Sequence, residues 1–355
     1  MRTVILETHN LKNLTGGFGV FNYGLVKAFS KMDLGNLSMK LCIQKSPAIQ
    51  AEFKKTFGYI TVFGFNRYKW LRINAKYDLW HSVNQNTKIE PRRIGKYLLT
   101  IHDVNFTGAA ASNKSNKRYQ SFHEKLQRAD AITYISEFAK RQTHECFDVP
   151  NVPEYVIHNG NPITELLDTT SYKSAVPVDK PYFYTIGDFL HKKNFTAIVE
   201  MMAELPDYNL ILSGNNNKPY GEEVKNLITR LHLENRVFLT GKVDNVGKQY
   251  YMKNCAAFLF PSTGEGFGLP PIEAMKFGKP IFLANRTSLP EVGGDHSFYW
   301  DDFDPKYMAD TVLNGLNKYN SNKDFYIRYY KERAESFSWD VAASKYVEVY
   351  NTLLS

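Results

Sequence analysis

The stretch Ser262–Met275, STGEGFGLPPIEAM, decides the fold. It lies between two short apolar runs, Ala256–Phe260 and Ile281–Ala284. Its two adjacent prolines suit the first turn of a helix, where a missing N–H costs nothing, and Gly278 suits the position just past a helix end. The stretch therefore predicts a strand, a glycine-rich loop, a helix and a second strand.

The loop of this unit predicts a ligand site. Gly266 and Gly268 let the backbone approach a ligand closely, and a helix N-terminus attracts phosphate. Glu265 falls in the loop, and the pattern places Glu273 in the first helical turn. Carboxylates accept hydrogen bonds from hydroxyls, and a ligand with both phosphate and hydroxyls is a nucleotide sugar. The alternative for Glu273 alone is that it only complements the helix dipole.

Strand and helix patterns alternate along the whole chain, which predicts parallel sheets covered on both faces. The fold class is α/β, with two doubly wound domains facing a central cleft and ligands at the carboxyl ends of strands. The expected strands are 3–6, 39–43, 79–83, 97–101, 131–135, 155–157, 182–186, 209–213, 237–239, 257–260, 281–284 and 297–300. The expected helices are 21–31, 116–128, 137–146, 194–204, 222–231, 249–254, 270–277, 305–318, 323–335 and 339–353.

One polar, proline-containing segment interrupts the alternation and predicts a linker. The expected organisation is an N-terminal domain at 1–165, a linker at 166–180 and a C-terminal domain at 181–335. Residues 336–355 are expected to form a helix that crosses back to the N-terminal domain.

The charge is uneven over the 355 residues, whose net charge is +8. Residues 1–180 hold 25 Lys and Arg against 15 Asp and Glu. Such a basic half suits an anionic partner, and a solvated lysine-rich surface is an equal alternative. No apolar run reaches the roughly 18–20 residues that span a bilayer, and three scattered cysteines suit a reduced, cytoplasmic protein. No recognised nucleic-acid-binding module is present, so a nucleic-acid partner is not expected.

Three further loops follow expected strands. GDFLHKKN (Gly187–Asn194) carries Lys192 and Lys193, whose ammonium groups suit a diphosphate without a metal; an ordinary lysine pair is the alternative. NLTGGFGVF carries Gly16 and Gly17 but fails the dinucleotide fingerprint. TIHDVNF carries His102, for which simple packing is the alternative.

These loops, taken in order, resemble a known family. PSTGEGFGLPPIEAMKFGKPIFLAN resembles the E-x7-E signature of retaining glycosyltransferase family 4, which has the GT-B fold of two Rossmann-like domains. The glycine loop, TIHDVNF, YVIHNGNP, the lysine loop, ANRTSLPEVGGD and FSWDVAASKYVEVY extend the resemblance over nearly the full length.

The resemblance implies roles by position. Glu273 would bind the donor ribose, Glu265 the transferred sugar, and Lys193 with Lys192 the diphosphate, while His102 would lie near the sugar at the reaction centre. The catalytic set is thus His102, Lys193 and Glu265, with no metal. The remaining donor-binding positions would be Gly16, Gly17, Gly241, Val243, Gly266, Phe267, Gly268 and Leu269.

The function that follows is a retaining, metal-independent hexosyltransferase. It would move a hexose, with a leaning to mannose, from a GDP- or UDP-linked sugar to a glycan or lipid-linked glycan in surface polysaccharide or lipopolysaccharide biosynthesis. No cofactor is expected. A front-face transfer needs no protein nucleophile, with double displacement as the less favoured route. A nucleotide-sugar epimerase and a non-catalytic glycan-binding protein remain alternatives.

The basic N-terminal domain suggests a membrane contact as well. Phe65–Trp80, FNRYKWLRINAKYDLW, interleaves basic and aromatic residues, as membrane interfaces do. The expected location is therefore cytoplasmic, with peripheral contact to the inner face of the membrane. A solvated edge with aromatic side chains in the core is the equal alternative.

Overall fold

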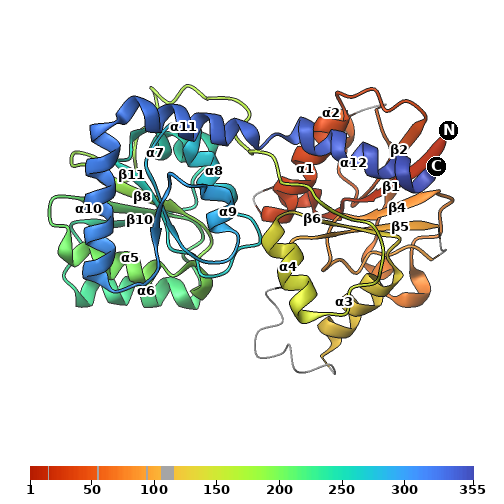
Figure 1. Ribbon diagram of the computed structural model, residues 1–355, viewed down its shortest axis with the longest axis horizontal. Helices are drawn as coiled ribbons and strands as arrows, with labels where there is room; N and C mark the ends of the chain where they lie inside the picture. The colour runs from red at the N-terminus through yellow and green to blue at the C-terminus, as the bar shows by residue number, and fades with distance from the viewer. Residues whose placement is uncertain (15, 54–55, 93–94, 105–115) are drawn as a thin grey trace. The chain divides into compact units, whose positions relative to one another are not determined.

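The structure is a computed structural model that describes residues 1–14, 16–53, 56–92, 95–104 and 116–355 (Figure 1). The chain divides into two compact units. Unit 1 comprises Met1–Pro162 and Phe337–Ser355, and unit 2 comprises Ile163–Ser336. Thr15 of the predicted glycine loop, and Asn105 and Phe106 of the predicted His102 loop, lie outside the described residues.

Unit 1 contains a seven-stranded parallel sheet in the order β3-β2-β1-β4-β5-β6-β7. The register is continuous, with Val4 of β1 opposite both Met39 of β2 and Leu79 of β4. The strands are β1 (Arg2–Glu7), β2 (Leu37–Ile43), β3 (Gly58–Thr61), β4 (Leu79–Ser82), β5 (Lys96–Ile101), β6 (Ala131–Tyr134) and β7 (Glu154–Val156).

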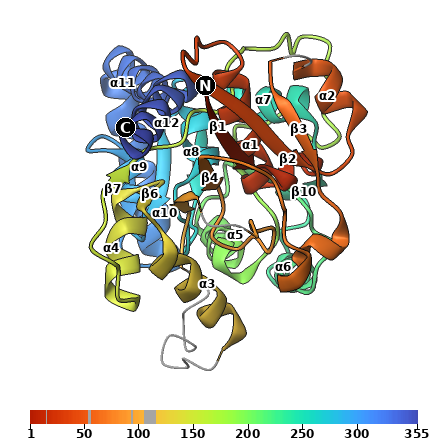
Figure 2. The same ribbon diagram turned by 90° about the vertical axis from the view of Figure 1, so that its right-hand side faces the viewer.

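Helices cover both faces of this sheet. Helices α3 and α4 pack over one apolar core, which includes Phe122, Ala139 and the strand residue Leu99. Helix α12 lies beside α1 although the two are far apart in sequence (Figures 1 and 2). The elements are η1 (His9–Lys12), α1 (Gly17–Phe29), α2 (Pro47–Phe53), η2 (Gly64–Arg67), η3 (Lys69–Leu71), α3 (Lys117–Arg128), α4 (Glu137–Cys146) and α12 (Trp339–Leu354).

Unit 2 contains a six-stranded parallel sheet in the order β10-β9-β8-β11-β12-β13. Four of its strands, β8, β9, β11 and β12, are buried along almost their whole length, as expected for a parallel sheet between two helical layers. The strands of the sheet are β8 (Tyr182–Ile186), β9 (Asn209–Ser213), β10 (Val237–Gly241), β11 (Ala257–Phe260), β12 (Ile281–Ala284) and β13 (Phe298–Trp300).

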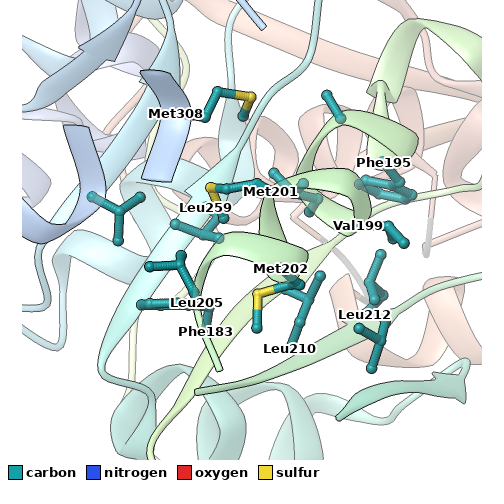
Figure 3. Close-up of a cluster of buried hydrophobic side chains, with 14 of the residues drawn as sticks. Phe183, Phe195, Val199, Met201, Met202, Leu205, Leu210, Leu212, Leu259 and Met308 are labelled. Atoms are coloured by element: carbon teal, nitrogen blue, oxygen red, sulfur yellow. The ribbon is translucent and has the colours of Figure 1, made fainter. Parts of the chain in front are cut away.

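Two buried clusters hold the helices of unit 2 to the sheet. Figure 3 shows one of them, in which Phe195, Val199 and Met201 of α5 meet Leu210 and Leu212 of β9. The other cluster joins the opposite face to α7, α8 and α11. The elements are η4 (His191–Lys193), α5 (Phe195–Met201), η5 (Met202–Glu204), α6 (Pro219–Arg230), α7 (Asn245–Asn254), α8 (Leu269–Met275), α9 (Leu289–Gly293), α10 (Pro305–Ser321) and α11 (Lys323–Ser336).

The predicted linker at 166–180 belongs to unit 2 in the structure. The Tyr172 ring packs on the rings of Tyr250 and Tyr251, with centroids 5.0 and 5.9 Å away. The Leu167 N–H donates to Gln249 Oε1 at 2.9 Å. The polar composition of segment 166–180 predicted a linker. The contacts of Tyr172 with α7 could not be predicted, because tertiary contacts leave no local sequence pattern.

Other predicted elements differ in position. Helix α1 begins at Gly17 rather than at residue 21, because the glycines predicted as a loop form its first turn. Strand β3 and the short helices α2 and α9 were not predicted. These three elements have four, seven and five residues, too few for a clear periodic pattern.

Candidate active site

The two loops with the strongest sequence signals leave neighbouring strands of unit 2. Strand order reverses between β8 and β11, which pair directly, with Ala257 opposite Phe183. Such a switch point leaves a crevice at the carboxyl ends of the two strands, where ligands bind in doubly wound sheets. The lysine loop follows β8 and the glutamate loop follows β11, so the topology brings both to one place.

An uncommon backbone conformation fixes the lysine loop. After β8 the chain forms the short helix η4, which ends at Lys193, and the next residue, Asn194, has φ of 51°. Left-handed φ values are rare outside glycine and cluster at functional sites. A Cβ added at Gly187 would lie 3.3 Å from Lys193 Cε, so the glycine leaves room for the lysine stem.

Lys193 and Glu265 form an ion pair between the two loops. Lys193 Nζ contacts Glu265 Oε1, and the two side chains are 12% and 13% exposed. Ser262 Oγ donates to the same carboxylate oxygen at 2.7 Å. Lys193 Nζ also lies 4.7 Å from the centre of the Phe260 ring, at the end of β11. The structure thus brings two of the three predicted catalytic residues into contact.

The Glu265 carboxyl is ionised at neutral pH. Burial raises its pKa, but Lys193 and Lys192, with hydrogen bonds from Lys193 and Ser262, outweigh burial and hold the pKa below its usual value. An ionised carboxylate accepts hydrogen bonds and cannot donate a proton. Glu265 is therefore suited to sugar hydroxyls rather than to general-acid work.

Backbone and hydroxyl contacts hold the two loops together. The Lys192 carbonyl accepts from the Thr263 N–H at 2.7 Å and lies 2.9 Å from Ser262 Oγ, whose single proton can be donated either to it or to Glu265. On the other side, Thr287 Oγ1 accepts from the Glu265 N–H at 3.3 Å, and Thr287 is itself left-handed, with φ of 54°. Glu265 is thus fixed through both its side chain and its backbone.

Gly268 sets the start of helix α8. Its φ of 125° is open only to glycine at low cost, and it is the residue before the helix. Helix α8 therefore begins at Leu269, so Glu273 is its fifth residue, and the prediction that Glu273 lies in the first turn is wrong. The helix-dipole explanation of Glu273 loses its basis, because dipole effects are confined to the first turn.

Glu273 has a different partner. It is 6% exposed, and its Oε1 accepts from Lys248 Nζ of α7 at 2.9 Å. Helix α7 follows directly after Gly241 and Val243, the predicted base-binding positions at the end of β10. Lys248 therefore connects α7, the helix that follows the predicted base-binding positions, to Glu273.

The other donor-binding positions lie on the connection from β11 to α8. Phe267 is 3% exposed, and its carbonyl accepts from the buried Ser288 hydroxyl at 2.7 Å. Gly266 and Leu269 flank the Phe267–Gly268 pair and are both partly exposed. The segment is therefore a rigid, partly open edge next to the Lys193–Glu265 pair.

The third predicted catalytic residue, His102, lies in unit 1. It follows β5, is 6% exposed and places Nε2 2.9 Å from the Val83 carbonyl. A carbonyl only accepts, so Nε2 carries the proton. Burial lowers the pKa of His102 to about 4 despite that bond, so the ring is neutral at pH 7.

His102 meets the glycine-loop helix within unit 1. The Phe18 and Phe21 rings of α1 contact the imidazole edge-on, with centroids 4.8 and 4.6 Å away. Gly16 precedes α1 and Gly17 opens it. Among described atoms, nothing lies within 4 Å of a Cβ built on Gly17, so the helix start is open there.

A metal site is not evident in the described part of the chain. No group of three or more His, Cys, Asp or Glu residues that could hold a metal ion occurs there. Within the same residues, no helix is both long and apolar enough to cross a bilayer.

Ser262, Thr287 and Lys248 were not predicted as site residues. Each acts on a partner through tertiary contact, and Lys248 stands 25 positions before Glu273. Of the three, only Ser262 could have been predicted from the sequence, since it lies three residues before Glu265 in the quoted stretch.

Comparison with known proteins agrees with the fold of the chain. The model of the family described as "Glycosyl transferases group 1" matches residues 168–332, nearly all of unit 2. With its two parallel-sheet α/β units, the chain has the GT-B fold of glycosyltransferases.

The chain is 27% identical over 308 residues to O-antigen chain mannosyltransferase B of Escherichia coli, covering 81% of this chain and 77% of that protein. A glycosyltransferase structure from Rickettsia africae ESF-5 has a TM-score of 0.76 at 15% identity, covering 100% and 99% of the two chains. Anabaena HepE in complex with UDP-glucose has a TM-score of 0.72 at 15% identity, covering 99% and 100%.

Proposed function

We propose that this glycosyltransferase moves mannose from a nucleotide-diphosphate mannose to a hydroxyl of a glycan or lipid-linked glycan, with retention at the anomeric carbon and without a metal ion. The single observation that carries the proposal is the buried pair of Lys193 and Glu265 at the switch point of unit 2. The likeness to an O-antigen mannosyltransferase supports the sugar and the polysaccharide. GDP is the preferred nucleotide of the donor.

Lys193 would stabilise the leaving diphosphate. Negative charge grows on the diphosphate as the glycosidic bond breaks, and a fixed ammonium group lowers the free energy of that charge. Lys193 carries a permanent partner, Glu265, which orients the ammonium group before the donor arrives. Lys192, partly exposed at the same loop, adds a second cation.

The glutamates would hold the donor from its two ends. The Glu265 carboxylate, fixed by Ser262 and by Lys193, would accept from hydroxyls of the transferred sugar. Glu273 would accept from the ribose hydroxyls, with Lys248 keeping its carboxylate in place. Within unit 1, the neutral His102 would offer a hydrogen-bond acceptor at Nδ1. Because no residue is assigned as nucleophile, the acceptor hydroxyl would attack on the face from which the diphosphate leaves and would pass its proton to an oxygen of the departing diphosphate.

A donor panel tests the proposal. GDP-mannose, UDP-glucose and ADP-glucose would be offered with a lipid-linked or soluble mannan acceptor, with and without EDTA, and the product anomer assigned by NMR. We expect an α-mannoside from GDP-mannose that is insensitive to EDTA. A β-linked product, a requirement for metal, or conversion of donor alone into an epimer would each contradict the proposal.

Variants separate the site from general charge effects. Lys193→Gln should lower kcat by about 10²–10³-fold, the cost of one donor to a developing anion. Lys225→Gln is the matched control, since it removes the same charge from an exposed i,i+3 pair on α6 of the same unit. Equal activity of the two variants would refute the role of Lys193.

A further inference from the structure

Unit 1 carries an exposed aromatic cluster that its core does not explain. Five of the twelve exposed large hydrophobic side chains in the described part of the chain fall between residues 63 and 71. Trp70 is 75% exposed and Tyr68 58%, and their rings stack with centroids 5.9 Å apart. Phe63 and Phe65 form a second stack, at 5.2 Å. We call these four rings the aromatic cluster.

The segment that bears these rings is rigid. Asn66 is 8% exposed, its Oδ1 accepts from the Phe63 N–H at 2.8 Å, and its Nδ2 donates to the Leu71 carbonyl at 2.8 Å. The next residues pair with 90–92, where the Ile73 N–H donates to the Glu90 carbonyl at 3.0 Å. Contiguous exposed apolar side chains held in a fixed arrangement mark an interaction surface.

A cationic pocket of about 170 Å³ adjoins this segment. Five cationic and two acidic side chains line it, so positive charge is in excess by three. Its inner wall is a triad in which the buried Lys125 and the partly buried Arg128 both contact the buried Glu90. Tyr97 also donates to Glu90, at 3.2 Å. These contacts fix the inner wall of the pocket, and the Glu90 carboxylate is already paired with Lys125, Arg128 and Tyr97.

The mouth of the pocket retains available cations. Arg72 pairs with Glu124 at 3.5 Å, and Glu124 is half exposed. Arg67 and Lys88 are exposed and enter no ion pair among the described residues. Arg67 sits in sequence between the two aromatic stacks. Arginine and lysine side chains converging on one concavity suit a phosphate group.

We propose that the pocket binds the headgroup phosphate of an anionic phospholipid while the aromatic cluster lies in the membrane interface. Tyr and Trp favour the headgroup level of bilayers, and cations near an anionic surface strengthen such contact. The combination of a cationic pocket with a flanking aromatic surface fits a lipid surface better than a soluble anion, which has no apolar part for the rings. The inference rests on the proposed function only in that a lipid-linked acceptor would lie at the same surface.

Part of the same stretch does serve the core. Trp80 is fully buried and Tyr77 packs beside it. The docking surface is therefore limited to residues 63–72 with the pocket mouth, and does not extend along all of Phe65–Trp80.

Vesicle co-sedimentation tests the proposal. We expect the full chain to sediment with phosphatidylcholine vesicles containing phosphatidylglycerol and not with phosphatidylcholine alone. Arg67→Gln with Lys88→Gln should weaken binding about 30-fold, since each cation near an anionic surface contributes about fivefold. Lys31→Gln with Lys345→Gln is the matched control, because it removes two exposed charges from unit 1 away from the pocket.

Further arms separate the alternatives. Tyr68→Ser with Trp70→Ser should also abolish sedimentation, although it leaves the charge intact. Equal loss in the control pair would show general charge attraction and overturn the proposal. Binding of inorganic pyrophosphate to a wild-type chain that ignores vesicles would assign the pocket to a soluble anion and overturn it too. Transfer to a soluble acceptor should be unchanged in the Arg67/Lys88 variant, so that loss of docking and loss of the proposed activity are told apart.

Discussion

Removing the ammonium group of Lys193 should destabilise unit 2 as well as stop catalysis. In Lys193→Met an apolar side chain of similar length replaces the cation, and the Glu265 carboxylate stays 13% exposed with only neutral donors such as Ser262. Breaking a buried ion pair from one side costs about 3–5 kcal/mol. Because both side chains keep some contact with solvent, we expect the lower end, about 3 kcal/mol.

Thermal unfolding at pH 7, followed by calorimetry, measures this cost. For a domain of this size, about 3 kcal/mol corresponds to a fall in Tm of roughly 6–12 °C. Lys193→Met with Glu265→Gln should recover most of that loss, because the uncompensated charge is gone. The double variant should nevertheless remain inactive. This pattern distinguishes loss of catalysis from loss of folding.

The pH dependence gives an independent check. The pKa of Glu265 is lowered in the folded state, so the pair's stabilisation is complete above the ordinary glutamate pKa of about 4.3. It is lost as the pH falls through the lower folded-state pKa. Glu265→Gln should therefore flatten the acid limb of the stability curve of unit 2. The cost of breaking a buried pair is several times larger than about 0.5 kcal/mol. A free energy of unfolding of Lys193→Met within about 0.5 kcal/mol of the wild-type value would therefore refute the reasoning.

Three further predictions concern other parts of the molecule. Glu273→Gln should raise the KM for the donor by about 10–100-fold with a smaller effect on kcat, since a hydrogen bond to a charged group contributes about 1.5–3 kcal/mol. His102 should lower the stability of unit 1 by up to about 3 kcal/mol as the pH drops from 6.5 to 4, because burial lowers its pKa to about 4 and only the unfolded chain binds this proton in that range. The buried His81, whose pKa is lowered to about 3, adds a second contribution of similar size, so His102→Gln should remove about half of the slope in pH-dependent urea unfolding. Gly160→Ala should destabilise unit 1 by about 1–3 kcal/mol, because the added Cβ would lie 2.3 Å from the Trp339 backbone nitrogen, whereas nothing lies within 4 Å of the same atom on the control Gly64.

Each of these has a contrary outcome. An unchanged donor KM in Glu273→Gln would leave the contact with Lys248 as purely structural. His81→Gln serves as the comparison, since it should remove only the share of the slope that comes from His81: if His102→Gln leaves the slope unchanged, the assignment of the other share to His102 is wrong. Equal stability of Gly160→Ala and Gly64→Ala would show that the start of α12 can move away from residue 160.

Most of the strands were predictable because they are buried on both faces. Parallel strands such as β11 and β12 are continuous apolar runs between helix-forming segments, β8 and β9 are mostly apolar, and the predicted bounds of all four are those observed. Helix α4 also has its predicted bounds, since Ser136 caps it by accepting from the Ala139 N–H. The start of α1 was missed because a glycine-rich turn can continue into a helix without any local signal.

The sequence by itself determined the α/β class, the strand–loop–helix units and the residue types at their carboxyl ends. Glycines, lysines and glutamates after strands are local features, and the E-x7-E stretch holds its spacing within one such unit. Only the tertiary structure decided which of these groups meet. The order of strands brings Lys193 to Glu265, 72 positions apart, and the contact with Lys193 keeps the Glu265 carboxylate charged in spite of its burial. The same structure joins Lys248 to Glu273, assigns the polar segment at 166–180 to unit 2 and leaves the aromatic rings at 63–70 exposed. These outcomes depend on which surfaces are removed from water together, and that is a property of the packed chain rather than of any short stretch of it.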